Sequence, residues 1–129
     1  MKFGYSILYV ENVQDTIAFY EKAFGFQRLF VTDANEYGEL DTGGTKLAFA
    51  ATRFVTTIMP QPFVAASAHT PAPPLELGFV TDQVEDAYAR AVAAGATEVK
   101  KPAAKPWGQV VGYVRDNNGF IIEICTPMG

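Results

Sequence analysis

The chain has 129 residues, of which 49% are hydrophobic and 19% are charged, and it predicts a single domain with a substantial apolar core rather than a disordered chain. Its formal net charge of −4 argues against a nucleic-acid partner, because phosphate binding needs a basic surface. No apolar run reaches the ~20 residues of a membrane helix, and one cysteine allows no internal disulfide, so we expect a cytoplasmic protein without membrane contact.

The first 52 residues predict a strand, a helix and three further strands. Residues 5–10 are rich in aromatic and branched side chains, which favours a strand. Asn12 is a good N-cap, and Gly25 is suited to end the helix in a left-handed conformation. Between them, apolar residues at i, i+4, i+7 and i+11 share one helical face: Val13, Ile17, Tyr20 and Phe24. The three strands are expected at residues 26–32, 37–41 and 45–51.

The same pattern returns 70 residues later, which indicates an internal repeat. Phe79 stands where Tyr9 stood, and Gly95 where Gly25 stood (79 − 9 = 95 − 25 = 70). This second module, residues 75–129, predicts a strand at 75–80 and a helix capped by Asp82. Its last three strands are expected at residues 98–101, 109–115 and 120–126.

A proline-rich segment, residues 53–74, connects the two modules. It contains five prolines, so neither a long helix nor a central strand is expected there. It also carries Phe54, Ile58 and Phe63, which make it too apolar for a simple linker. Three interpretations remain open: it covers a pocket, it contacts a second subunit, or it packs on its own sheet.

Two acidic residues interrupt apolar strands. Side chains alternate between the faces of a strand, so Glu123 shares a face with Ile121 and Cys125, and Glu76 shares one with Gly78 and Val80. A carboxylate among apolar side chains is costly unless water or a partner satisfies it. The pair therefore indicates a polar spot on a concave sheet. The alternative is that each acid points to solvent or pairs with a basic residue at a strand end.

Several motifs in order resemble the vicinal oxygen chelate superfamily, which includes glyoxalase I, bleomycin-resistance proteins and extradiol dioxygenases. They are Tyr9-Val10-Glu11-Asn12-Val13 before the first helix, Phe24-Gly25-Phe26 after it, and the closing segment from Val114 to Ile124 with Asn117 where proline is usual. The resemblance implies an α+β fold in which two βαβββ modules form a curved mixed sheet around a cup-shaped cavity. It also implies a homodimer.

In metal-dependent members of that superfamily, one ligand comes from each of four strands. The resemblance places these ligand positions on Tyr5, Ala48, Glu76 and Glu123, and only Glu123 has the usual residue type. His69, the single histidine, lies in the connecting segment and matches none of them. A divalent metal such as Zn, Ni, Mn or Fe could be held weakly by Glu76 and Glu123, but no cofactor is expected.

Bleomycin-resistance-like members bind a small molecule in the same cavity without a metal, by aromatic stacking and shape. The residues expected to line such a cavity here are Tyr5, Ile7, Tyr9, Ala48, Glu76, Trp107, Val111, Tyr113, Glu123 and Cys125. Trp107, the single tryptophan, stands on a loop at a strand mouth and could instead serve only to pack that loop. Cys125 is not expected to be a nucleophile, because no histidine or lysine is placed to ionise it.

Three functional hypotheses follow. In the first, the protein binds a small organic molecule, which could be an antibiotic, without a metal. In the second, it is a metal-dependent glyoxalase-type lyase, isomerase or dioxygenase that uses Glu76 and Glu123, with Glu123 as a metal ligand or general base. In the third, the proline-rich segment binds a partner protein and the fold has a structural role.

Overall fold

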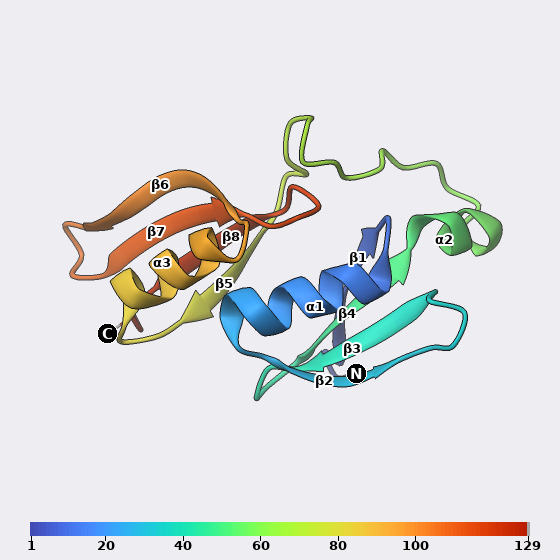
Figure 1. The fold of residues 1–129 in the computed structure, drawn as a ribbon, viewed down its shortest axis with the longest axis horizontal. Coiled ribbons are helices and arrows are strands. Elements are labelled where there is room, and N and C mark those ends of the chain that lie inside the picture. The colour runs from blue at the N-terminus through green and yellow to red at the C-terminus, as the bar shows by residue number, and fades with distance from the viewer. Residues whose placement is uncertain (129) are drawn as a thin grey trace. The chain divides into compact units, whose positions relative to one another are not determined.

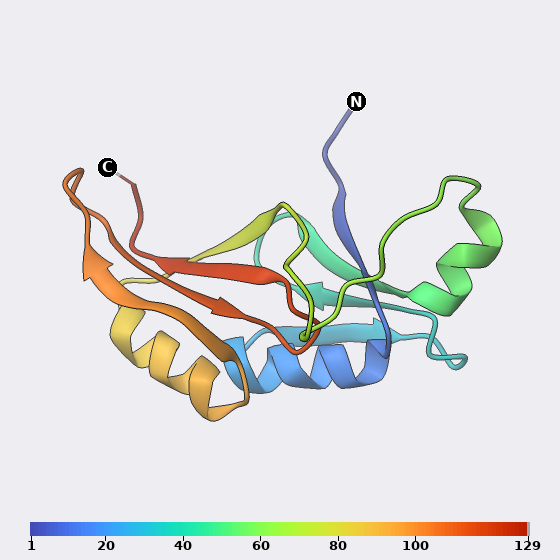
Figure 2. The same cartoon turned by 90° about the horizontal axis from the view of Figure 1, so that it is seen from above.

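The structure, a computed structural model, describes residues 1–128. The chain divides into two compact units, and the boundary along the sequence lies between Ala66 and Ser67. Each unit contains one four-stranded mixed sheet with a helix packed across one of its faces, α1 in the first unit and α3 in the second (Figures 1 and 2).

The first unit begins with the predicted βαβββ order. Its elements are β1 (Tyr5–Val10), α1 (Val13–Phe24), β2 (Gln27–Val31), β3 (Tyr37–Asp41), β4 (Lys46–Ala51) and a short helix α2 (Thr52–Ile58). The strand order is β1-β4-β3-β2, with β1 parallel to β4 and the other pairs antiparallel. The short helix α2 fills the start of the connecting segment, where neither a long helix nor a central strand was predicted.

Helix α1 begins and ends where the sequence predicts. The side chain of Asn12 accepts a hydrogen bond from the backbone N–H of Asp15 at 3.0 Å, which satisfies a donor that the first turn would otherwise leave unpaired. Gly25 ends the helix with φ 75°, a left-handed conformation that only glycine adopts without a Cβ clash. Both predicted caps are confirmed.

The core of the first unit lies between α1 and its sheet. Ile17 and Tyr20 of α1 are fully buried, and the ring of Tyr20 packs against Phe49 of β4 with centroids 4.9 Å apart. Leu8, Leu40, Leu47 and Phe49 alternate toward this helix along their strands. The residues between them therefore point to the opposite face, which includes Tyr5, Ile7 and Glu39.

The second unit repeats the arrangement. Its elements are β5 (Glu76–Val80), α3 (Val84–Ala93), β6 (Thr97–Ala104), β7 (Val110–Arg115) and β8 (Ile121–Cys125). The strand order is β5-β8-β7-β6, with β5 parallel to β8. Ile122, Ile124 and Val114 are buried on the side of α3, together with Val84 and Ala91 of the helix.

The predicted start of α3 is wrong by one residue. Gln83, not Asp82, occupies the N-cap position, and its side chain makes no capping hydrogen bond. The hydroxyl of Thr81 instead accepts from the backbone N–H of Gln83 at 3.1 Å. This turn pairs the backbone N–H of Gln83 with a side chain that precedes the helix. The helix therefore begins one residue later than an N-cap at Asp82 would place it.

Strand β6 is longer than the predicted residues 98–101 and lies at the edge of its sheet. Its pairing with β7 shifts register between Glu98 and Lys100 and again between Lys100 and Ala103. Pro102 lies within the second shift, where a residue without an N–H does not break a regular ladder. The irregular pairing explains why simple alternation underestimated the length of this strand.

Arg115 links the start of the second unit to the turn between β7 and β8 by hydrogen bonds. The guanidinium of Arg115 donates to the carbonyl oxygens of Gly119 at 2.8 Å, Ser67 at 3.1 Å and Thr70 at 2.7 Å. Gly119 has φ 92°, and a Cβ at this position would clash with the carbonyl of Ser67. This contact accounts for the start of the second unit at Ser67.

The observed architecture confirms the predicted α+β class and the two βαβββ modules, with one four-stranded sheet in each module. Among the helices of residues 1–128, none combines the length and apolar character needed to cross a lipid bilayer.

Candidate functional site

The face of the second sheet opposite α3 carries both acids singled out in the sequence. The pairing register places Gly78, Glu123 and Tyr113 side by side across β5, β8 and β7. Side chains two residues apart on a strand share a face, so Glu76 lies diagonally next to Glu123. We call this surface the acid face; its members are Glu76, Gly78, Val80, Val111, Tyr113, Arg115, Ile121, Glu123 and Cys125.

The carboxyl groups of Glu76 and Glu123 interact directly. The pKa of Glu76 is raised above its usual value by partial burial of the carboxyl group, by the negative charge of Glu123, and by a hydrogen bond between the two groups. A nearby negative charge disfavours the ionised form of a carboxyl group, because like charges repel each other. Glu76 and Glu123 therefore place two neighbouring carboxyl groups on the face of the sheet that α3 does not cover.

Tyr113 and Cys125 extend this pair. The hydroxyl of Tyr113 donates to Oε1 of Glu123 at 3.2 Å. Burial raises the pKa of Tyr113, and the hydrogen bond to Glu123 and its charge raise it further, so the phenol stays a donor. Burial also raises the pKa of Cys125 to about 11, with Glu123 adding to the shift. Both groups therefore stay neutral beside the carboxyl pair at neutral pH.

Trp107 projects from the loop between β6 and β7, with 62% of its surface exposed. Its indole N–H donates to the side-chain oxygen of Gln109 at 2.7 Å, and the Gln109 amide donates to the carbonyl of Thr126 at 2.8 Å. Gly108 turns the loop with φ 100°. These bonds fix the orientation of the indole while its ring stays open to solvent.

The predicted cavity residues of the first unit share one face of its sheet, opposite α1. Tyr5 and Ile7 are about half exposed, at 49% and 48%, and Tyr9 packs its ring against Phe63 with centroids 4.9 Å apart. Ala48 is fully buried on this face. In the second unit, Val111 and Cys125 are also buried. Because other side chains cover them, none of the buried residues Ala48, Val111 and Cys125 offers an open surface to a ligand. The cup-shaped cavity and the ligand-binding roles of these residues stay predictions.

The sequence analysis missed one charged cluster on the first unit's open face. Glu39 of β3 is buried, its Oε2 accepts from the Tyr37 hydroxyl at 2.8 Å, and its Oε1 lies 3.4 Å from Nζ of Lys46. Alternation in residues 37–41 places Tyr37 and Glu39 on one face, so the signal was available. The partner of Glu39, Lys46, lies on the neighbouring strand and is brought beside it only by strand pairing.

The donor set does not fit the metal site that the fold family implies. Its four ligand positions hold a tyrosine, an alanine and two glutamates, and a divalent ion of catalytic type normally takes three protein ligands. Within residues 1–128, no three His, Cys, Asp or Glu side chains are grouped to hold a metal ion. His69 is exposed in the connecting segment, outside the strands that carry these four positions. We therefore assign no chemical step to a metal.

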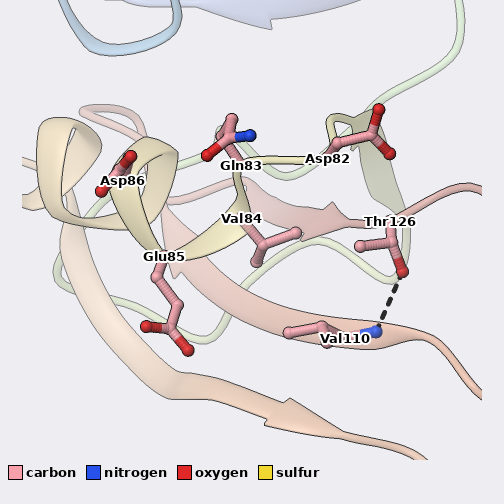
Figure 3. A pocket seen from close by; sticks show the side chains of 7 residues that line it. All are labelled: Asp82, Gln83, Val84, Glu85, Asp86, Val110 and Thr126. Atoms are coloured by element: carbon pink, nitrogen blue, oxygen red, sulfur yellow. Dashed lines mark hydrogen bonds between the residues drawn. The ribbon is translucent and has the colours of Figure 1, made fainter.

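Two hollows of the second unit lie away from the acid face. One, of about 300 Å³, is lined by Val110, Thr126 and residues 82–86. Its acidic side chains, Asp82, Glu85 and Asp86, point apart rather than toward one point, and Thr126 accepts from the Val110 N–H at 3.0 Å (Figure 3). The other, of about 600 Å³, lies between α3 and β6 beside Tyr88 and Pro102. No residue predicted for the site lines either of these two hollows.

Comparison with solved structures supports the fold. A glyoxalase-related enzyme from Fulvimarina pelagi is 23% identical with a TM-score of 0.82, covering 98% of this chain and 88% of its own. A glyoxalase/bleomycin resistance protein/dioxygenase family enzyme from Burkholderia phytofirmans PsJN is 21% identical with a TM-score of 0.80, covering 98% of both chains. TioX from Micromonospora sp. ML1 is 25% identical with a TM-score of 0.74 and the same coverage.

Among curated proteins, none matches this sequence. The sequence profile of a family does match, and it spans residues 2–124, which is nearly the whole chain. The repeat, the two βαβββ modules and this match lead to one conclusion: the chain belongs to the Glyoxalase/Bleomycin resistance protein/Dioxygenase superfamily.

Proposed function

We propose that this protein binds a small organic cation on the acid face without a metal. The observation that carries the proposal is the pair of neighbouring carboxyl groups, Glu76 and Glu123, on a sheet face that also carries Tyr113, Arg115 and several apolar side chains. A ligand ammonium or amidinium group stabilises both carboxylates, because it offsets the repulsion between them and donates several hydrogen bonds.

The surroundings favour a ligand with an apolar or aromatic body. Val80 is 63% exposed beside the pair, and the Trp107 ring is open to solvent at the β6–β7 loop. Binding sites for small molecules combine apolar walls with a few polar groups, and aromatic rings add cation–π attraction. An antibiotic that carries an amino group falls within this ligand class.

The proposal is tested with a library of aromatic cations, each paired with its uncharged isostere, by calorimetric titration and by thermal shift. We expect cations to bind and isosteres to bind at least tenfold more weakly, a difference of about 1.4 kcal/mol. Affinity should increase as the pH rises through the raised pKa of Glu76, because below it the ligand must displace a proton.

Substitution separates a specific site from general charge attraction. Glu123→Gln should weaken cation binding at least tenfold. Glu98→Gln makes the same charge change on β6, but Glu98 pairs with Val114 and so lies on the helix side of the sheet. It should change the affinity less than twofold. If the two variants bind alike, or if no cation is preferred over its isostere, the proposal is wrong.

A second candidate function is proton transfer, in the manner of a glyoxalase-type lyase or isomerase with Glu123 as general base. The raised pKa of Glu76 beside Glu123 favours it, since a carboxyl group transfers protons more effectively when its pKa lies closer to the working pH. The same titrations decide between the functions. Each bound compound is followed for hours by mass spectrometry, and conversion that Glu123→Gln abolishes would make the protein an enzyme.

A further inference from the structure

The first unit buries a carboxylate on the face of its sheet opposite α1. Glu39 is 6% exposed, and both of its oxygens have partners: the Tyr37 hydroxyl at 2.8 Å and the Lys46 ammonium at 3.4 Å. A buried carboxylate is costly unless it is paired and hydrogen-bonded. This position therefore needs a cation.

The pairing register brings the cluster together. Glu39 of β3 lies opposite Ala48 of β4, and Lys46 of β4 lies opposite Tyr5 of β1. Since alternate residues share a face, Tyr5, Lys46 and Glu39 project on the same side of the sheet, and Tyr37 follows two residues from Glu39. Because Ala48 has a small side chain, it leaves space on this face of the sheet for the carboxylate of Glu39 on the neighbouring strand.

The Lys46 head group has the surroundings of a bound organic ammonium. Its nitrogen lies 5.8 Å from the centroid of the Tyr5 ring, within the range of a cation–π contact, while Glu39 supplies the negative charge. The Tyr37 hydroxyl is directed to the carboxylate and keeps it in place. A carboxylate and an aromatic ring together are the groups that recognise an ammonium ion.

We propose that Glu39, Tyr5 and Tyr37 form an ammonium-binding site that the chain's own Lys46 occupies, and that an amine ligand takes the place of the lysine head group. This site lies in the first unit and uses none of the residues of the acid face. It takes a primary ammonium on an alkyl or aryl body.

Exchange of one ammonium for another is feasible for two reasons. The Lys46 side chain is 48% exposed, so its flexible stem can move to solvent. Glu39 stays paired throughout, because the incoming ammonium replaces the outgoing one. Ile7 and Phe30, on the same face and 48% and 44% exposed, offer apolar contact for the ligand's body.

Chemical rescue tests the site. Lys46→Met keeps most of the apolar stem but leaves Glu39 without its cation, so the melting temperature should fall by about 4 °C. n-Butylammonium chloride should restore it with a saturable dependence on concentration. Sodium chloride at equal ionic strength should restore much less, because a hydrated ion makes no contact with the Tyr5 ring.

The controls isolate the site. The double variant Lys46→Met/Glu39→Gln should show no rescue, because no carboxylate remains to bind the ammonium. Lys101→Met, in the second unit, loses the same charge and should show neither the destabilisation nor the rescue. Glu123→Gln should leave the rescue of Lys46→Met unchanged, so this inference can fail or succeed independently of the acid face.

A measurement on the unsubstituted protein tests the same site without any substitution. Titration with n-butylammonium should shift the NMR signals of the Lys46 Hε protons toward those of a free lysine, while signals of Lys101 stay unchanged. Rescue by sodium chloride equal to that by butylammonium, or Lys46 signals that do not move, would show that the pair only stabilises the fold.

Discussion

Cys125 shows how surroundings decide the chemistry of a side chain. Reactive thiols lie beside a cation or a base that stabilises the thiolate. Here the neighbour is Glu123, and burial, the contact with Glu123 and the charge of Glu76 raise the pKa of the thiol to about 11. The thiol is therefore kept neutral, and its role on the acid face is that of a small apolar group.

We predict slow reaction of Cys125 with Ellman's reagent. At pH 8 the folded protein should react at least ~100-fold more slowly than the protein unfolded in guanidinium, since the raised pKa leaves few thiolates and burial blocks access. The rate should increase as the pH rises toward 11. Glu123→Gln should speed the reaction at pH 8, and a thiol in the folded protein that reacts like a free one would contradict this assignment.

The site residues could be predicted only in part. Glu76 and Glu123 were recognised because a charge in an apolar strand is visible in the sequence, and the structure brings them together. Their proximity depends on the register between β5 and β8, which no local pattern contains. Glu39 was missed although its alternation is clear, because its partner Lys46 is on another strand and becomes a neighbour only through pairing.

At the scale of elements, the two long helices differ in how well their ends could be predicted. For α1, Asn12 and Gly25 make the contacts that their residue types favour. For α3, Asp82 has the right residue type but not the position, because the hydroxyl of Thr81 forms a turn just before the helix. Caps compete with neighbouring turns for the same backbone donors, and the sequence does not show which one forms.

The β7–β8 turn gives a prediction about glycine. Gly119 and Gly43 have almost the same φ, 92° and 89°, but a Cβ on Gly119 would clash with the carbonyl of Ser67, whereas a Cβ on Gly43 meets no atom within 4 Å. We expect Gly43→Ala to destabilise by about 1 kcal/mol, the cost of the backbone conformation alone. Gly119→Ala should cost at least ~2 kcal/mol more in urea unfolding. Equal losses would mean that the contact with Ser67 is dispensable.

At the scale of the whole molecule, duplication was the most informative signal in the sequence. The 70-residue offset predicted both modules and their element order, and the structure confirms them. The sequence predicts the start of the second module at residue 75, whereas the boundary of the second compact unit lies earlier in the chain. It lies at Ser67, inside the proline-rich segment, because Arg115 fastens residues 67–70 to the second sheet through contacts that span more than forty residues.

We also propose that the protein is a homodimer. Large apolar side chains are exposed in both units: Phe3, Ile58 and Val64 in the first, and Val80 and Val99 in the second. A contact between two copies of the chain would remove such side chains from water, which favours association. Light scattering after size exclusion should give twice the chain mass of 14.0 kDa at micromolar concentration. A mass of one chain at all concentrations would show that the protein is monomeric.

The irregular edge strand β6 has a consequence for solubility. An exposed sheet edge can recruit a strand from another molecule and so start fibril growth. Along β6, Pro102 offers no N–H, the register shifts break the regular spacing of the remaining donors, and Lys100 and Lys101 place two positive charges beside them. An incoming strand would meet gaps and charge where it needs a continuous ladder, so this edge resists uncontrolled polymerisation.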